Sequence, residues 1–174
     1  MKSRSPWLLL GLLVAAGAAL ATGPRVLRAD LSGDEEVPAV FTTGKGDLRL
    51  LVYPGRNTIA YELTYSGLTA PVTQAHIHFG QPAVNGAISA FLCTNLGNGP
   101  TGTQPCPNSG TISGVITADQ VVASAAAQGI AAGDIDALID VLREQLTYVN
   151  VHSTRFPGGE IRGQIGHHRG GHHH

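Results

Sequence analysis

The segment from residue 57 to residue 68 constrains the fold most, because its apolar and polar side chains alternate strictly. In NTIAYELTYSGL, every second position carries a large side chain, namely Ile59, Tyr61, Leu63 and Tyr65. This period of two is typical of a strand with one buried face. The preceding run, KGDLRLLVYP, alternates in the same way, and the turn-forming PGRN joins the two runs. The pattern predicts a β-hairpin.

Most of the remaining chain also has strand-like patterns separated by turn formers. Further strands are expected in VTQAHIHFG, AISAFLC and GTISGVI, and a final hairpin in TYVNVHS and GEIRGQI, joined by FPGG. Residues 22–29 are interpreted as a short linker, with strands beginning at about Leu31. The 23 glycines and 10 prolines agree with a fold that has many turns.

Helical periodicity is confined to residues 117–146. Thr117 and Gln120 match a capping box that opens an alanine-rich turn or helix, which Gly129 ends. Asp134 is expected to cap a second helix, whose apolar residues recur at i, i+3, i+4 and i+7. The whole pattern predicts an all-β Greek-key sandwich or barrel of about eight strands, with a helical excursion before the final hairpin.

The first 21 residues have the pattern of a secretory signal peptide. Lys2 and Arg4 precede a 14-residue apolar run that ends at Leu20, and Ala19-Leu20-Ala21 supplies a cleavage pattern. The run is shorter than the ~20 residues of a membrane-spanning helix, although an uncleaved anchor is the alternative. We therefore expect a secreted or periplasmic protein without stable membrane insertion after cleavage. Residues 167–174, GHHRGGHHH from Gly166 onward, are expected to form a disordered, histidine-rich tail.

Export to an oxidising compartment makes a disulfide between Cys93 and Cys106, the two cysteines of the chain, the favoured interpretation. A thiolate metal pair is the alternative. Closing a loop of this length contributes roughly 3 kcal/mol of stability in the chain-entropy description. The near balance of 11 Lys and Arg against 12 Asp and Glu argues against a nucleic-acid partner.

The motif AHIHFG places His76 and His78 on the same face of a strand, where two imidazoles can converge on one ion. The third histidine outside the tail is His152 in YVNVHS. If Ile77 and Val151 face the hydrophobic core, all three histidines point away from it. A transition-metal site for Cu or Zn is one interpretation. A polar network of surface or hydrogen-bonding histidines is the other.

The same reasoning places Asn150, Glu160 and Arg162 on this polar face. Glu160 and Arg162 are interpreted as a cross-strand charge pair, or Glu160 as a carboxylate that orients a metal-binding imidazole. The neighbouring glycines of GGEIRGQI are expected to serve the turn. Glu35 and Glu36 are expected to be exposed, and the chain contains neither G-x-S-x-G nor a P-loop motif.

Several blocks together resemble the CHRD domain, named after repeats in chordin. They are LSGDEEVPAV, GKGDLRL, YELTYSGL, TQAHIHFG, NGAISAFLC, GTISGVITADQV and YVNVHSTRFPGGEIRGQI, spread over residues 28–166. The resemblance implies an extracellular β-sandwich module and no established activity. The HxH strand is also similar to the copper-binding strand of Cu/Zn superoxide dismutase, although three histidines are too few for its paired metal site.

Three functional hypotheses follow. The leading one is an exported, non-enzymatic binding module whose partner is a metal ion or an extracellular protein. The second is a mononuclear copper or zinc metalloenzyme. The third is a structural domain of the envelope or matrix without a ligand.

Overall fold

The alternating segments form the middle of one layer of the molecule, as a long antiparallel hairpin. The computed structural model describes residues 23–166. β2 (Lys45–Tyr53) pairs with β3 (Thr58–Ser66) along its whole length. A short 3₁₀ turn, η2 (Pro54–Arg56), joins them, and Asn57 takes the left-handed conformation with φ 49°. The four large side chains of β3 are buried, so the predicted buried face is confirmed.

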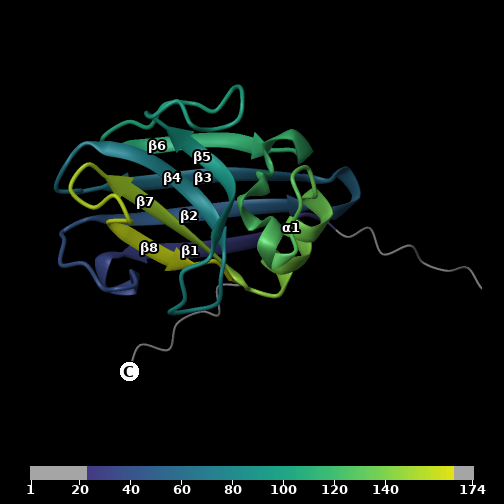
Figure 1. Cartoon of the computed structure of the whole chain (residues 1–174), viewed down its shortest axis with the longest axis horizontal. Helices are drawn as coiled ribbons and strands as arrows, with labels where there is room; N and C mark the ends of the chain where they lie inside the picture. The colour runs from purple at the N-terminus through teal and green to yellow at the C-terminus, as the bar shows by residue number, and fades with distance from the viewer. Residues whose placement is uncertain (1–22, 167–174) are drawn as a thin grey trace, which may run out of the picture.

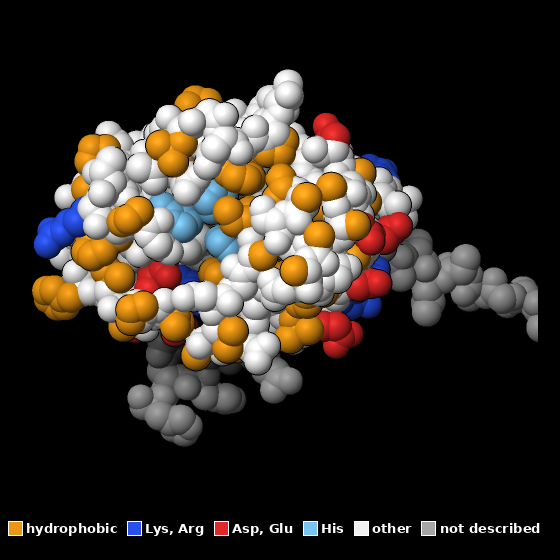
Figure 2. Space-filling model, in the orientation of Figure 1, with side chains coloured by type: hydrophobic (Ala, Val, Ile, Leu, Met, Phe, Trp, Pro, Cys, Tyr) orange, Lys and Arg blue, Asp and Glu red, His pale blue; other side chains and the backbone are white. Residues whose placement is uncertain are grey.

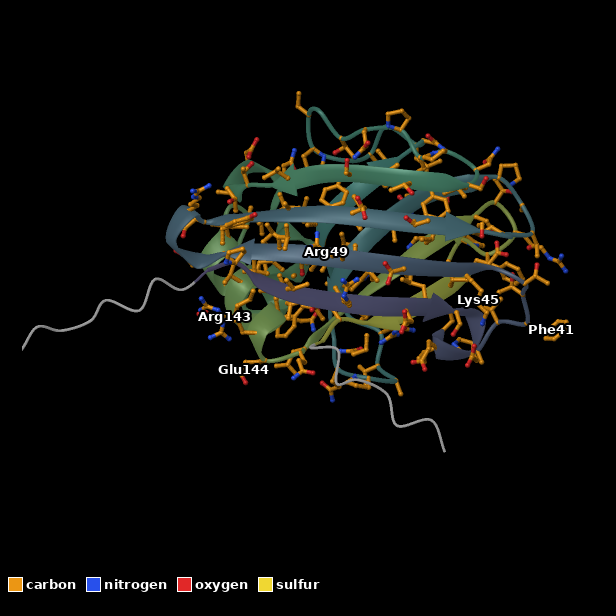
Figure 3. The ribbon with its side chains drawn as sticks, turned by 180° about the vertical axis from the view of Figure 1, so that it is seen from behind. Phe41, Lys45, Arg49, Arg143 and Glu144 are labelled. Carbon is orange, nitrogen blue, oxygen red and sulfur yellow. A yellow bond between two sulfur atoms is a disulfide. The ribbon has the colours of Figure 1, made fainter. Side chains whose placement is uncertain are left out.

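The eight strands within residues 23–166 belong to one antiparallel sheet in the order β5-β4-β7-β8-β1-β2-β3-β6. The other strands are β1 (Arg25–Ser32), β4 (Val72–Phe79), β5 (Ala87–Thr94), β6 (Gly110–Ile116), β7 (Thr147–Ser153) and β8 (Ile161–Gln164). The sheet curves into a nearly closed barrel, with β4, β5, β7 and β8 in front (Figure 1) and β1, β2, β3 and β6 behind (Figure 3). The predicted all-β class is confirmed.

The helical excursion lies at one end of the barrel (Figure 1). It contains η3 (Ala118–Gln120), η4 (Ala123–Gln128) and α1 (Ile135–Arg143). The apolar face of α1 is buried in the core, and Asp134 caps the helix by accepting a hydrogen bond of 2.9 Å from the Ala137 amide. The capping box at Thr117 is wrong, because Thr117 makes no side-chain cap bond and its hydroxyl donates instead to Asp119. Gly129, with φ 100°, ends η4 as predicted.

The expected linker over residues 22–29 is wrong, because β1 already begins at Arg25. Its pairing with β2 starts at Arg25 opposite Val52. Leu27 and Ala29 are buried, whereas the residues between and beside them are exposed or half-buried. The alternation of a strand therefore begins before Leu31, where the sequence analysis placed its start. A second 3₁₀ turn, η1 (Gly33–Glu35), follows β1. The signal-peptide and histidine-tail segments lie outside the described residues, and no helix within residues 23–166 is long and apolar enough to cross a membrane.

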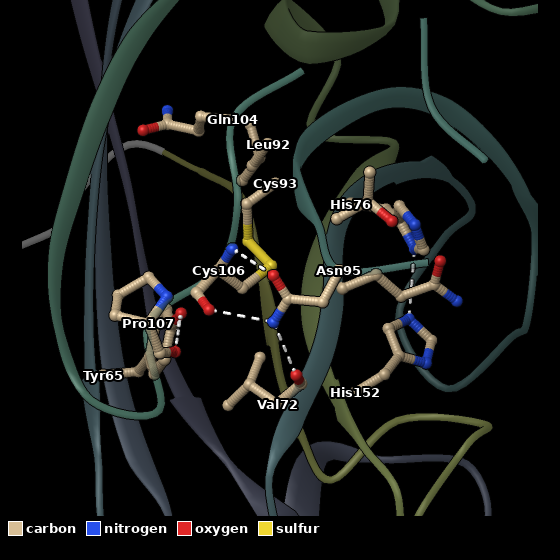
Figure 4. The surroundings of a disulfide bond; sticks show 12 residues. Tyr65, Val72, His76, Leu92, Cys93, Asn95, Gln104, Cys106, Pro107 and His152 are labelled. Atoms are coloured by element: carbon tan, nitrogen blue, oxygen red, sulfur yellow. Dashed lines mark hydrogen bonds between the residues drawn. A yellow bond between two sulfur atoms is a disulfide. The ribbon is translucent and has the colours of Figure 1, made fainter. Parts of the chain in front are cut away.

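The open seam between β5 and β6 is tied by the disulfide. Cys93 on β5 is bonded to Cys106 in the loop that leads to β6, so the predicted pairing is confirmed. Asn95 donates hydrogen bonds to the carbonyls of Val72 and Cys106, 2.9 Å each, which binds this loop to the start of β4 (Figure 4). The loop and β5 therefore form a rigid boundary beside the strand that carries two of the histidines.

Candidate metal centre

The pairing of β4 with β7 brings the three histidines together on one face of the sheet. His76 lies opposite Asn150, and His152 lies opposite Gln74, two pairs further along and on the same face. Residues directly and diagonally opposite on one face are close enough for side chains to touch. We call His76, His78 and His152 the three-His cluster.

Each imidazole offers a nitrogen that lies within 4.8 Å of a nitrogen on the other two. The closest approach joins His76 Nδ1 to His152 Nε2 at 3.1 Å (Figure 4). The ring centroids of His76 and His78 lie 5.4 Å apart, and those of His76 and His152 4.9 Å apart. Histidines separated by 76 positions in the chain therefore converge, which is the geometry that a shared ion requires.

The cluster lies opposite the hydrophobic core as predicted, but its side chains are buried. Exposed fractions are 0% for His76, 7% for His78 and 5% for His152. Phe91 contacts the His76 ring with centroids 4.4 Å apart, and Tyr148 stacks on His78 at 4.6 Å. Figure 2 shows the imidazoles recessed among hydrophobic side chains on this face. The interpretation as surface histidines is therefore wrong, because side chains and loops cover the outer face of β4 and β7.

The hydrogen bonds of the cluster fix where the protons lie. His78 Nδ1 donates to the Gly86 carbonyl at 3.0 Å, and His152 Nδ1 donates to the Pro157 carbonyl at 2.9 Å. A carbonyl oxygen only accepts, so each ring carries its proton on Nδ1 and presents the lone pair of Nε2. An Nδ1–H bond to a backbone carbonyl is the usual way in which proteins orient a metal-binding imidazole.

The Nε2 atoms of His76 and His78 are buried and make no hydrogen bond with any described residue. His152 Nε2 accepts a hydrogen bond from His76 Nδ1 at 3.1 Å, and it also lies 2.9 Å from Asn150 Oδ1, an amide oxygen that repels its lone pair. A cation between the groups, or rotation of the amide, removes that repulsion. Buried groups without partners cost about 1–3 kcal/mol each, so a ligand for these lone pairs would stabilise the protein.

Burial keeps the imidazoles neutral at pH 7. It lowers the pKa of His76 to about 2, with further lowering from the charges of His152 and His78. Burial also lowers the pKa of His78 to about 4, against the opposing hydrogen bond to Gly86. The pKa of His152 is lowered by burial and partly restored by Pro157. Neutral imidazole is the form that binds metals.

The donor set fits a transition-metal ion after a small adjustment. With metal–nitrogen distances of about 2.0–2.1 Å, two ligating nitrogens lie at most about 4.2 Å apart. The widest separation in the three-His cluster is therefore reduced by less than an ångström, a change that rotation of the rings provides. Three neutral nitrogen donors suit copper or zinc better than calcium or magnesium.

Arg162 and Tyr148 build one wall of the site. The Arg162 guanidinium lies over the Tyr148 ring at 3.5 Å from the centroid. It also donates hydrogen bonds to the Val84 carbonyl at 2.9 Å and to Asn85 Oδ1 at 3.2 Å. Arg162 thereby holds the loop that carries Gly86, the hydrogen-bond acceptor of His78.

Glu160 is buried but points to other partners. Its Oε1 accepts hydrogen bonds of 2.7 Å from the Thr42 hydroxyl and the Thr69 amide. Within residues 23–166 it forms no salt bridge with Arg162 and no hydrogen bond with the three-His cluster. The structure therefore brings Asn150 and Arg162 to the cluster but does not bring Glu160 there.

Glu36 is the residue of this region that the sequence analysis missed. It was expected to be exposed, but only 6% of it is exposed. Burial raises the pKa of its carboxyl to about 7, against the opposing effects of Arg162 and Asn150. Gly159, with φ 129°, leaves the space for it, because a Cβ at Gly159 would lie 2.2 Å from Glu36 Oε1. The glycine pair was the available sequence signal, although it was assigned to the turn.

The fold and site define an all-β domain with a buried group of three neutral imidazoles. The family model for the CHRD domain matches residues 27–165, and the chain belongs to this family. Comparisons with curated proteins and with solved structures gave no match.

Proposed function

We propose that the protein is an exported binding module that holds one copper or zinc ion through His76, His78 and His152. The observation that carries this proposal is the convergence of three buried, neutral imidazoles with nitrogens within 4.8 Å of one another. Two of their rings are oriented by Nδ1–H bonds to backbone carbonyls. Those bonds place the ring protons on Nδ1 and leave the Nε2 lone pairs without a proton, as a metal site requires.

Export is supported by two independent features. The Cys93–Cys106 disulfide is typical of proteins that fold in oxidising compartments. The N-terminal sequence has the charge, apolar run and small residues of a signal peptide. A secreted or periplasmic module would meet copper or zinc outside the cytoplasm.

In this proposal the protein residues bind and orient, and no residue of the site transfers a proton. Phe91 and Tyr148 exclude water from the three-His cluster, which strengthens its interaction with a cation. Asn150 Oδ1 lies beside His152 Nε2 and is placed to act as a fourth ligand, an oxygen donor in addition to the three nitrogens. A site closed in this way favours retention of the ion over turnover.

The test is metal binding to the mature chain with its five tail histidines changed to serine, since that tail binds metals by itself. We expect one equivalent of Cu(II) or Zn(II) by titration calorimetry and elemental analysis. His76→Ala and His152→Ala should each lower the affinity at least tenfold. Gln74→Ala, on the same strand, should retain the ion. Far-UV circular dichroism checks that each variant is folded.

The alternatives predict different results. Absence of a stoichiometric ion from the folded, tail-substituted chain would contradict the proposal and support a polar network in a structural domain. A bound ion that also turns over in a dismutase or oxidase assay would support the metalloenzyme. An ion that binds without turnover supports the binding module.

A further inference from the structure

A second candidate site lies on the other side of Asn150 from the three-His cluster and contains none of the three histidines. It is a cavity of about 250 Å³, lined by residues of the segments 36–40 and 155–159 and by Asn85. We call it the Glu36 cavity. Pockets for drug-sized ligands have volumes of ~300–1,000 Å³, so any occupant is small.

The Glu36 cavity is lined by one buried carboxyl group, that of Glu36, and one of its two oxygens lacks a hydrogen-bond partner. Glu36 is 94% buried, and its Oε1 accepts no hydrogen bond from any described residue. The positive charge of Arg162 acts on Glu36, but within residues 23–166 the two form no salt bridge, and Arg162 is already bonded to Val84 and Asn85. A buried carboxylate oxygen in this state requires a donor, and a cationic donor forms the strongest hydrogen bond.

The remaining lining decides the chemical class of that donor. Val37, Pro38, Val40 and Phe156 supply apolar surface around the carboxylate. The carbonyls of Pro157 and Gly158 are directed inward, toward His152 and Asn150. A hard metal cation requires about six oxygen ligands, and this cavity does not offer them. An ammonium group on a short apolar chain satisfies both the carboxylate and the walls.

We propose that the Glu36 cavity binds a small primary amine, with the ammonium group donating to the Glu36 carboxylate and the alkyl chain packed on Phe156. Arg155 lies exposed at the mouth, with its guanidinium 5.3 Å from the Phe156 centroid. Its positive charge disfavours a second cationic group on the ligand. The preferred ligand is therefore a monoamine rather than a diamine.

Butylammonium is a suitable probe for the mature protein, and butyrate is the control of opposite charge. Binding is measured by NMR chemical shifts at pH 8 in EDTA, because an amine nitrogen is itself a ligand for copper and zinc. We expect saturable shifts at residues 36–40 and 155–159 with butylammonium, and none with butyrate. Equal binding of the two probes would overturn the proposal.

Two variants test the residues. Glu36→Gln should weaken butylammonium binding at least tenfold, while Glu35→Gln, on the exposed neighbour, should leave it unchanged. Gly158→Leu should also weaken binding tenfold with Glu36 intact, because Gly158 lines the cavity and a Cβ there meets no atom within 4 Å, which leaves room for a leucine side chain to fill it. Unchanged affinity in either Glu36→Gln or Gly158→Leu would refute the site.

These outcomes are separate from those of the metal proposal. Glu36 contacts none of the three histidines through a hydrogen bond. The Glu36→Gln variant is therefore expected to retain the copper or zinc ion while losing the amine. A protein that binds no metal but binds butylammonium would refute the first proposal and support the second.

Discussion

Glu36→Gln is expected to stabilise the protein in a manner that depends on pH. The carboxyl group is buried, and burial raises its pKa to about 7 from an ordinary value of 4.5. Because the pKa is raised in the folded state, the unfolded chain ionises more readily than the folded one. This difference destabilises the folded protein when the pH rises above 4.5, and the full cost is reached above pH 7. Glutamine has nearly the same shape and never ionises.

The magnitude follows from the two pKa values. One pKa unit corresponds to about 1.4 kcal/mol, so a shift from 4.5 to about 7 costs about 3 kcal/mol at pH 8. At pH 5 the folded protein holds a protonated carboxyl, and the cost falls to about 1 kcal/mol. The variant should therefore exceed the wild type in stability by about 3 kcal/mol at pH 8 and by about 1 kcal/mol at pH 5.

Urea unfolding of the metal-free mature protein, followed by far-UV circular dichroism at both pH values, measures this difference. Glu35→Gln is the matched control, because Glu35 is exposed and its replacement should change stability by less than about 0.5 kcal/mol. An equal gain at pH 8 and pH 5 would refute the ionisation argument. A loss of stability at pH 8 would show that the Glu36 carboxylate is satisfied in the folded protein.

Two other predictions concern the histidines and the disulfide. In the metal-free Glu36→Gln background, lowering the pH from 7 to 5 should destabilise the folded protein, with His76 and His78 contributing about 2 kcal/mol each. The reason is that both imidazoles bind a proton below pH 6.5 in the unfolded chain but stay neutral in the folded one, where their pKa values are lowered. Urea midpoints that stay constant over this interval would contradict the buried, neutral state. Replacing Cys93 and Cys106 together by alanine should cost about 3 kcal/mol in the same assay. A change below about 1 kcal/mol would show that the seam between β5 and β6 is held by other contacts, such as the 2.7 Å hydrogen bond from Tyr61 to the Leu92 carbonyl.

The parts of the fold that the sequence predicted are those with strong local signals. The alternation of β3 predicted its buried face residue by residue, because one side of each strand in the rear layer faces solvent. Asp134 predicted the start of α1, because an N-cap side chain satisfies free amides of the first turn. The disulfide also followed from simple reasoning, since a chain with two cysteines has one possible pairing.

Burial of the candidate site depends on contacts between distant segments, which a period of two cannot reveal. Every residue of β7 is buried, because both of its faces are covered. Its apolar and polar residues nevertheless alternate, as they do in a strand with one exposed face. Arg162 of β8 reaches carbonyls 78 and 81 positions earlier, and these bonds hold a loop above the histidines. Glu36 occupies space that Gly159 leaves free, a contact across more than a hundred residues. The alternation therefore gave the correct direction of the histidines but the wrong exposure.

The energetics of the three-His cluster favour a ligand over a purely structural role. Two buried Nε2 atoms lack partners among residues 23–166, and each unsatisfied group costs about 1–3 kcal/mol. Apolar side chains of similar volume would remove that cost without exposing surface, because the cluster is already covered by Phe91 and Tyr148. A ligand that binds only the folded state, at a concentration 100 times its Kd, contributes about 2.7 kcal/mol. A bound cation thus offsets the cost of the unpaired nitrogens, whereas a structural domain would bear it without compensation.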